Sequence, residues 1–204
     1  MEKVNLYIIN INEARKYYNK MYAQISDFRK ERADSYYHDD DKLRSVCAAF
    51  LVKKFVKCEE LKYNEFGKPY ADNGKFFNVS HSGSFVGLVI SDYEVGLDIE
   101  AILKKDMSFL SNIFDEKDLK GASLEDMYLL WCNKESLSKC IGRGLRDIKE
   151  APAKPLNGKK TYDNAHYSCA SFVYDKYAFS VTIKGFEEFE VEKKLVKVEK
   201  YFDK

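Results

Sequence analysis

The sequence has few cysteines and histidines, and they do not have the spacing of a zinc site or a disulfide framework. Its five cysteines form an odd set without a C-x-x-C pair, and only three histidines are present. These counts argue against a structural zinc site, a multi-histidine metal centre and a disulfide-stabilised fold. The sequence therefore favours a reduced, soluble protein of the cytoplasm.

An excess of charge of one sign is also missing. Lys and Arg total 34 and Asp and Glu total 33, which leaves a formal net charge of +1. Without a strong overall field, any anion site has to be local. No stretch reaches 18 apolar residues, and the N-terminal MEKVNLYIINI lacks the features of a secretory signal. We therefore expect neither a nucleic-acid nor a membrane partner.

The chain has the composition of a globular protein, with 45% hydrophobic and 33% charged residues. Its 204 residues exceed a typical domain of about 150 and predict one elaborated domain or two small halves. A chain of this length can bury a core without disulfides.

Hydrophobic patterning predicts helices followed by strands, twice along the chain. Strands are expected over 4–11, 76–79, 85–91, 95–100, 168–173 and 177–183, and helices over 12–32, 41–58, 108–118 and 124–141. The predicted fold class is α+β with mainly antiparallel sheets, in two similar halves with a pseudo-twofold relation, 1–93 and 94–204. Residues 185–204 are compatible with a strand, a helix or a frayed tail.

Two carboxylates end one of the predicted strands, at Asp98 and Glu100. The period of two places both on one face while Ile99 faces the core. Mg²⁺ is bound by one or two such carboxylates together with water and phosphate oxygens. A solvated pair of charges at the end of a strand is the alternative.

A predicted helix carries Trp131, Glu135 and Lys139 on one stripe, since the three are spaced by four residues. The common interpretation of such a pair is a surface salt bridge worth about 0.3 to 0.5 kcal/mol. The single tryptophan in the stripe indicates that this face is partly buried, which favours a functional carboxylate and ammonium.

The segment from Asn78 to Ser82 ends another predicted strand before a glycine turn. Ser80 and His81 can both donate to phosphate oxygens, although a structural histidine is the alternative. Four basic residues, Arg29, Arg32, Arg44 and Lys68, lie around these elements and individually are typical surface charges. Because no glycine-rich phosphate loop is present, side chains and a metal ion would have to hold any phosphate.

Read in order, five motifs resemble the 4'-phosphopantetheinyl transferases of the surfactin-synthetase type. They are Y-H-x(2)-D-x(2)-R at 37–44, G-K-P at 67–69, F-N-V-S-H-S at 77–82, G-L-D-I-E at 96–100, and W-C-N-K-E-S-L-S-K-C-I-G-R-G-L at 131–145. The length is similar to that of the monomeric members with two halves, so a monomer is expected.

The resemblance implies an enzyme that moves the phosphopantetheine arm of coenzyme A, its co-substrate, to a serine of an acyl or peptidyl carrier protein. It places Mg²⁺, or Mn²⁺ in its stead, on Asp98, Glu100 and Glu135. Catalytic roles fall on Asp98, on Glu135 as the base, and on Lys139, which contacts the pyrophosphate, with Lys134 as a second candidate. The adenosine bisphosphate part of coenzyme A would be held by a further set: Arg29, Arg32, Arg44, Lys68, Pro69, Ser80 and His81.

The resemblance also divides the halves by role. Residues 1–93 would form the side that binds coenzyme A, and residues 94–204 would supply the metal strand, the catalytic helix and the docking surface for the carrier protein. Two other functions are compatible with the sequence: a non-catalytic regulator of the same fold that binds coenzyme A or a nucleotide, and a Mg²⁺-dependent phosphodiesterase or nuclease. The second would need a basic groove, which the net charge of +1 does not support.

Overall fold

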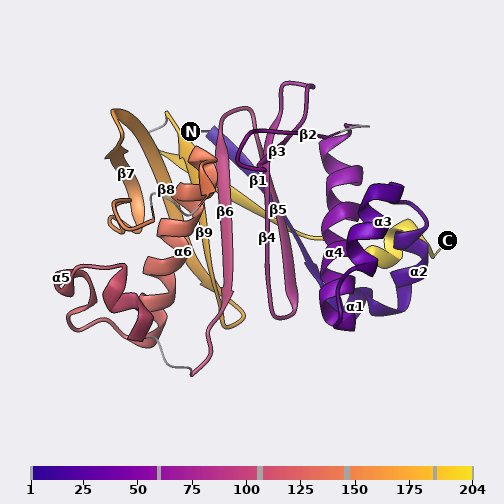
Figure 1. The fold of residues 1–204 in the computed structure, drawn as a ribbon, viewed down its shortest axis with the longest axis horizontal. Helices are drawn as coiled ribbons and strands as arrows, with labels where there is room; N and C mark the ends of the chain where they lie inside the picture. Colours follow the sequence, from indigo (N-terminus) through magenta and orange to yellow (C-terminus); the bar gives the residue numbers. More distant parts are fainter. Residues whose placement is uncertain (1, 59–60, 105–107, 145–147, 186–187, 204) are drawn as a thin grey trace.

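The structure is a computed structural model that describes residues 2–58, 61–104, 108–144, 148–185 and 188–203. The strands are β1 Glu2–Asn10, β2 Lys62–Tyr63, β3 Pro69–Tyr70, β4 Phe76–Ser82, β5 Phe85–Ser91, β6 Val95–Ala101, β7 Asn157–Tyr162, β8 Ala165–Tyr174, β9 Tyr177–Lys184 and β10 Phe189–Leu195. The α-helices are α1 Ile11–Ala14, α2 Tyr18–Tyr22, α3 Asp27–Asp34, α4 Asp39–Leu51, α5 Glu116–Leu119 and α6 Leu124–Ile141. Figure 1 shows two halves, each with helices packed on a sheet. The α+β class with mainly antiparallel sheets is thus confirmed.

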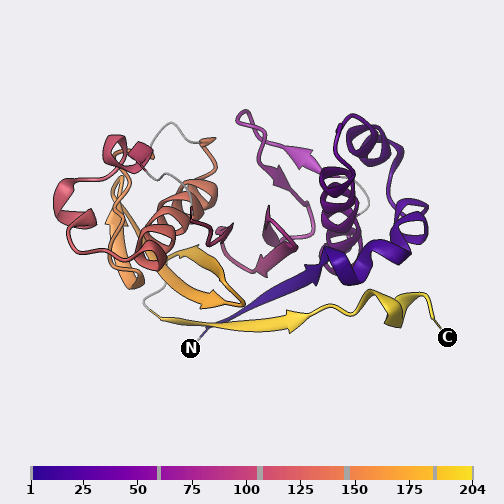
Figure 2. The same ribbon diagram turned by 90° about the horizontal axis from the view of Figure 1, so that it is seen from below.

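The sheet of the first half has the order β10-β1-β5-β4. The pairs β1–β5 and β4–β5 are antiparallel, whereas β1–β10 is parallel. Strand β10 comes from the C-terminal end of the chain, so residues 189–203 cross to the half built by residues 1–93. Figure 2 shows β10 beside β1 and the C-terminus near α2. The last segment of the chain is therefore neither frayed nor part of the second sheet.

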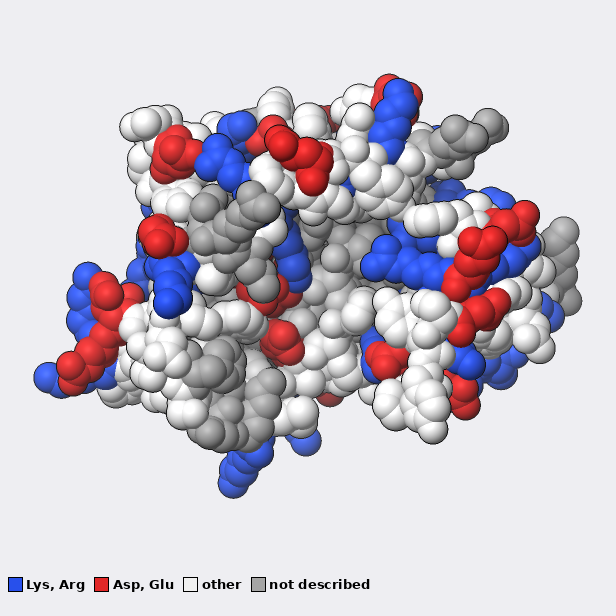
Figure 3. Space-filling view, in the orientation of Figure 1, with Lys and Arg blue, Asp and Glu red and all other residues white. Residues whose placement is uncertain are grey.

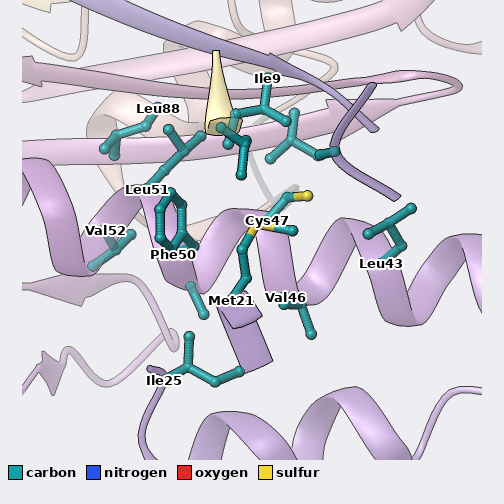
Figure 4. Close-up of a cluster of buried hydrophobic side chains, with 14 of the residues drawn as sticks. Ile9, Met21, Ile25, Leu43, Val46, Cys47, Phe50, Leu51, Val52 and Leu88 are labelled. Carbon is teal, nitrogen blue, oxygen red and sulfur yellow. The ribbon is translucent and has the colours of Figure 1, made fainter. Parts of the chain in front are cut away.

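Helix α4 provides the main buried surface of the first half. Its stripe of five apolar residues, Leu43, Val46, Cys47, Phe50 and Leu51, is at most 2% exposed. Figure 4 shows this stripe against Ile9 and Leu88 of the sheet on one side and Met21 and Ile25 on the other. The helix ends earlier than expected and continues as a π-helical segment, Val52–Val56.

The single helix expected over residues 12–32 is wrong. The chain forms α1, a 3₁₀ turn at Arg15–Tyr17, α2 and α3 instead, and Ser26 before α3 is extended. Ile11, Ala14, Tyr17 and Met21 are all buried. Short helices that change direction keep each of them against the core, and one straight helix would not.

The second sheet has the order β6-β9-β8-β7 and is antiparallel throughout. Strand β7 was not expected from the sequence. Helix α6 packs on this sheet and approaches β6 at Gly96, where a Cβ atom would lie 2.0 Å from the carbonyl oxygen of Ser136. Only glycine permits this approach, so Gly96 sets the distance between α6 and β6.

The two sheets are joined by an apolar cluster that includes Leu6, Phe85, Leu97, Ile99 and Phe179. Strands β4 and β6, which belong to different sheets, face each other at this junction. In the described part of the chain, no helix is long and apolar enough to cross a bilayer.

Candidate active site

Helix α6 carries two of the candidate residues and has well-defined ends. At its N-terminus, Ser123 Oγ accepts from Asp126 N at 3.1 Å while the Asp126 carboxylate accepts from Ser123 N at 2.9 Å, which forms a capping box. At its C-terminus, Gly142 adopts φ +81°, the left-handed conformation in which glycine commonly ends a helix. Between these caps, Glu135 and Lys139 lie one turn apart on the same stripe.

The ammonium group of Lys139 connects carboxylates from two elements. Its Nζ lies 2.5 Å from Oδ1 of Asp98 on β6 and 3.2 Å from Oε2 of Glu135 on α6. The side chain of Asp98 is 3% exposed, while those of Glu135 and Lys139 are 14% and 30% exposed. The structure therefore brings these three candidate residues together at the edge of a partly open site.

Burial dominates the electrostatics of this group. It raises the pKa of Asp98 to about 6, against the opposing effect of Lys139 and with further repulsion from Glu135 and Glu100. Burial alone would lower the pKa of Lys139, but the charges of Asp98 and Glu135 and their hydrogen bonds raise it above its ordinary value. At pH 7, Asp98 and Lys139 therefore form an ion pair.

Two serines of β4 hold the carboxylates of β6. Ser80 Oγ donates to Asp98 Oδ1 at 3.1 Å and lies 3.4 Å from Lys139 Nζ. Ser82 Oγ donates to Glu100 Oε2 at 3.0 Å. The contact between Ser82 and Glu100 was not expected from the sequence, although the alternation of polar residues in N-V-S-H-S was an available signal.

The carboxylates fit a hard divalent cation, which prefers oxygen ligands. Within the described residues, no three His, Cys, Asp or Glu side chains form a ready metal cluster, and the ammonium of Lys139 lies among the carboxylates instead. However, Asp98 Oδ2 is buried and has no hydrogen-bond partner among the described residues. The neighbouring thiol of Cys132 donates to the carbonyl of Ala178 at 3.6 Å. A buried carboxylate oxygen without a donor suits a cation.

Across the site, Arg44 of α4 and His81 of β4 form part of a basic wall. Arg44 makes a salt bridge with Asp41 at 2.6 Å and donates to the carbonyl oxygen of Gly83 at 2.7 Å, so it also holds the turn between β4 and β5. The pKa of His81 is lowered, first by partial burial and then by repulsion from Arg44 and Lys139. The imidazole is therefore less readily protonated than that of an ordinary histidine.

The same turn is held from the other half by Tyr177 of β9, which the sequence did not identify. Its hydroxyl oxygen accepts from Ser84 N at 2.9 Å, and a Cβ on Gly83 would lie 2.5 Å from that oxygen. No local signal marks Tyr177, because β9 reaches this turn only in the folded chain.

Arg29 and Arg32 lie on α3, and neither has a salt bridge within the described part of the chain; Arg32 is exposed and Arg29 half-buried. Figure 3 shows a hollow between the halves, with basic side chains on the side of α3 and α4 and acidic side chains on the side of α6 and β6. A separate cavity of about 870 Å³ includes Arg29, Phe28 and Tyr63 but none of the carboxylates.

Two of the expected lysines lie apart from the carboxylates. Lys68 Nζ donates to the carbonyl oxygens of Cys140 at 2.8 Å and Val95 at 3.3 Å, and burial lowers its pKa. It fastens the short β2–β3 hairpin to the end of α6. Pro69, the first residue of β3, is half-buried beside it.

Lys134 differs more clearly from the expectation. It is 3% exposed, and its Nζ donates to the carbonyl oxygens of Lys149, Ile148 and Ile113 at 2.7, 3.0 and 3.1 Å. Its position five residues before Lys139 turns it to another face of α6. Lys134 thus binds carbonyl oxygens of two loops and does not lie beside the ion pair of Asp98 and Lys139.

Part of the chain is similar in sequence to known proteins. Residues 94–189 match the family model described as the 4'-phosphopantetheinyl transferase superfamily. The chain is 29% identical over 146 residues to the 4'-phosphopantetheinyl transferase gsp of Aneurinibacillus migulanus, which covers 64% of this chain and 62% of that protein. It is 26% identical over 138 residues to the 4'-phosphopantetheinyl transferase Sfp of Bacillus subtilis (strain 168), covering 59% and 62%.

A third relative is the 4'-phosphopantetheinyl transferase AcpT of Salmonella typhi, with 35% identity over 104 residues that cover 45% of this chain and 54% of that protein. The chain thus spans less than two thirds of the length of these curated relatives. The matched segment contains β6 and α6, the elements that carry Asp98, Glu135 and Lys139. Residues 94–189, less than half of the chain, are thus similar to the 4'-phosphopantetheinyl transferase superfamily.

Proposed function

We propose that this protein transfers the 4'-phosphopantetheine arm of coenzyme A to a serine hydroxyl of an acyl or peptidyl carrier protein and releases adenosine 3',5'-bisphosphate. The match of residues 94–189 to the family model of the 4'-phosphopantetheinyl transferase superfamily supports this reaction class. The observation that carries the proposal is the meeting of Asp98, Glu135 and Lys139 between β6 and α6, opposite a basic wall.

The reaction forms a bond between the serine oxygen and the phosphorus that bears the pantetheine, and breaks the bond from that phosphorus to the bridging oxygen of the pyrophosphate. Glu135, whose side chain is 14% exposed, accepts the proton of the serine hydroxyl. Lys139 presents a positive charge to the departing bisphosphate, where negative charge accumulates. Its contacts with Asp98 and Glu135 keep that ammonium protonated and in place.

Asp98, Glu100 and Glu135 would together hold Mg²⁺, with Mn²⁺ as the alternative ion. When bound, the ion supplies positive charge at the pyrophosphate of coenzyme A and fixes its orientation. The buried Asp98 Oδ2 without a hydrogen-bond donor supports this assignment.

The basic wall would hold the 3'-phosphate of coenzyme A. Arg44 and His81 line it from α4 and β4, Arg29 and Arg32 extend it along α3, and Lys68 and Pro69 lie on the side assigned to the adenine. In this division of roles, residues 1–93 bind coenzyme A, and residues 94–204 provide the metal strand, the catalytic helix and the docking surface for the carrier protein. We propose that the enzyme acts as a monomer in the cytoplasm.

The test is the intact mass of a generic apo carrier protein after incubation with this protein, coenzyme A and Mg²⁺, with EDTA as the metal control. We expect the carrier to gain one phosphopantetheine and to remain unmodified in EDTA. Glu135→Gln should abolish the gain without unfolding the protein. Glu125→Gln, which removes the same charge from an exposed position of the same helix, should retain it.

Transfer at the wild-type rate by Glu135→Gln would contradict the assignment of the base and the metal site. Coenzyme A binding without transfer to any of several carriers would favour a regulator that binds coenzyme A without catalysis.

A further inference from the structure

Strands β4 and β6 are joined by side chains instead of a backbone ladder. They belong to different sheets, and β6 makes its backbone pairs with β9 on its other edge. The outward N–H groups of Leu97, Ile99 and Ala101 donate instead to side-chain oxygens of β4. These acceptors are Asn78 Oδ1 at 3.0 Å, Ser80 Oγ at 3.3 Å and Ser82 Oγ at 3.0 Å, which we call the three rungs of the β4–β6 seam.

The three rungs differ in the further hydrogen bonds that their side chains make. A serine oxygen that accepts from a backbone N–H still has its own hydrogen to donate. At two rungs that hydrogen reaches a carboxylate: Ser80 donates to Asp98, and Ser82 donates to Glu100 Oε2 at 3.0 Å. At the first rung, Asn78 receives the N–H of Leu97 and contacts no carboxylate through a described hydrogen bond.

We propose that Ser82 is a positioning residue that holds the carboxylate of Glu100 toward a divalent cation. This inference rests on the proposed function, because it assumes that Glu100 is a metal ligand. Ser82 accepts from Ala101 N and donates to Glu100, so two bonds at one oxygen tie the carboxylate to the backbone of its own strand. Partners of this kind orient metal ligands, and their removal weakens metal binding about 10- to 100-fold.

Ser82 is suited to this role because Glu100 is only partly buried. Asp98 is enclosed by the protein and is also held by Lys139, whereas Glu100 is half-exposed near the end of β6. A half-exposed glutamate has three side-chain torsions to order when it binds a cation. A donor that already holds one of its oxygens reduces that cost.

The test measures binding of Mn²⁺ to the 204-residue chain in the presence of coenzyme A, from the loss of the free Mn²⁺ signal in electron paramagnetic resonance. Coenzyme A alone gives the blank. We expect Ser82→Ala to raise the Kd for Mn²⁺ about tenfold, and Ser82→Thr, which keeps a hydroxyl group, to stay within about threefold of the wild type. The variant Ser82→Cys, whose thiol is a weak donor, replaces Ser82→Ala if the alanine variant does not fold.

Asn78→Ala is the matched control, since it removes one rung of the seam without touching a carboxylate. It should lower the urea midpoint at least as much as Ser82→Ala, because Asn78 is only 7% exposed, while the Kd for Mn²⁺ stays within about threefold of the wild type. The inference is overturned if Ser82→Ala binds Mn²⁺ as the wild type does, or if Asn78→Ala weakens binding equally. If the wild-type protein binds no Mn²⁺ above the blank, the metal site of the proposed function fails, and the inference fails with it.

Discussion

Gly96 of β6 and Ser136 of α6 are in contact through their backbones, so that a Cβ at residue 96 would lie 2.0 Å from the Ser136 carbonyl oxygen and 2.4 Å from Cys140 N. Ser136 follows Glu135 directly, and Cys140 follows Lys139. The contact therefore lies beneath the two site residues of α6. It sets how closely they approach Asp98, two residues further along β6.

Gly96→Ala should push α6 away from β6, because the atoms in its path belong to backbone and cannot turn aside. We expect the free energy of unfolding in urea to fall by about 3 kcal/mol. Gly87→Ala is the control: its Cβ would meet Ile99 Cδ1 at 2.6 Å and Leu97 Cδ2 at 3.1 Å, both ends of side chains that can adjust. A smaller loss for Gly96→Ala than for Gly87→Ala would contradict this explanation.

His81 should make coenzyme A binding depend on pH. Its pKa is lowered in the free protein by burial and by Arg44 and Lys139, so a proton has to be taken up before the imidazolium can pair with a phosphate. We expect calorimetry to show tighter binding at pH 6 than at pH 7.5, and weaker binding by His81→Ala at pH 6. The variant should lose most of this pH dependence; an unchanged dependence would place the titrating group elsewhere.

The variant Lys134→Met tests whether Lys134 stabilises the fold or binds coenzyme A. The substitution removes donors from the carbonyls of Ile113, Ile148 and Lys149. We expect a loss of about 3 kcal/mol in urea unfolding and faster amide exchange around residues 113 and 148, with a Kd for coenzyme A within about twofold of the wild type. A tenfold rise in that Kd would instead support the binding role inferred from the sequence.

Lys160 should make stability increase with pH. It is 4% exposed and donates to Asn133 Oδ1 and the carbonyl of Pro152, and burial lowers its pKa to about 8. Below pH 8, both the folded and the unfolded chain hold the proton, and the folded state bears the cost of burying it. Between about pH 8 and the ordinary value of 10.5, only the unfolded chain holds it, so Lys160 contributes a stability that rises with pH.

Urea unfolding of the wild type and Lys160→Met at pH 8 and pH 10 measures this contribution. The stability of the wild type relative to the variant should rise with pH, toward a limit on the order of 3 kcal/mol. A difference that shrinks or stays constant over this range would show that Lys160 has an ordinary pKa in the folded protein.

Local sequence was sufficient to predict those helices and strands in which the spacing of apolar residues marks the buried face. The stripe of α4, the capped helix α6 and the strands β5 and β6 follow from apolar spacing and from residues that end helices, because these signals lie within one element. The pairing of Glu135 with Lys139 was foreseen for the same reason, since four residues make one turn. Alternation along β6 likewise placed Ile99 in the core and Asp98 and Glu100 on the other face.

Which elements face one another could be seen only in the tertiary structure. Asp98 and Lys139 are 41 residues apart, and Ser82 precedes Glu100 by 18, so neither contact has a local signature. Strand β10 joins β1 across nearly the whole chain, and Lys134 turns to carbonyls of distant loops. The order of amino acids specifies which residues are apolar, charged or able to end a helix. Which residues contact one another depends on how the two sheets pack and on the close approach that Gly96 permits. The spacing of apolar residues shows that a face is buried, but it does not show which element covers that face.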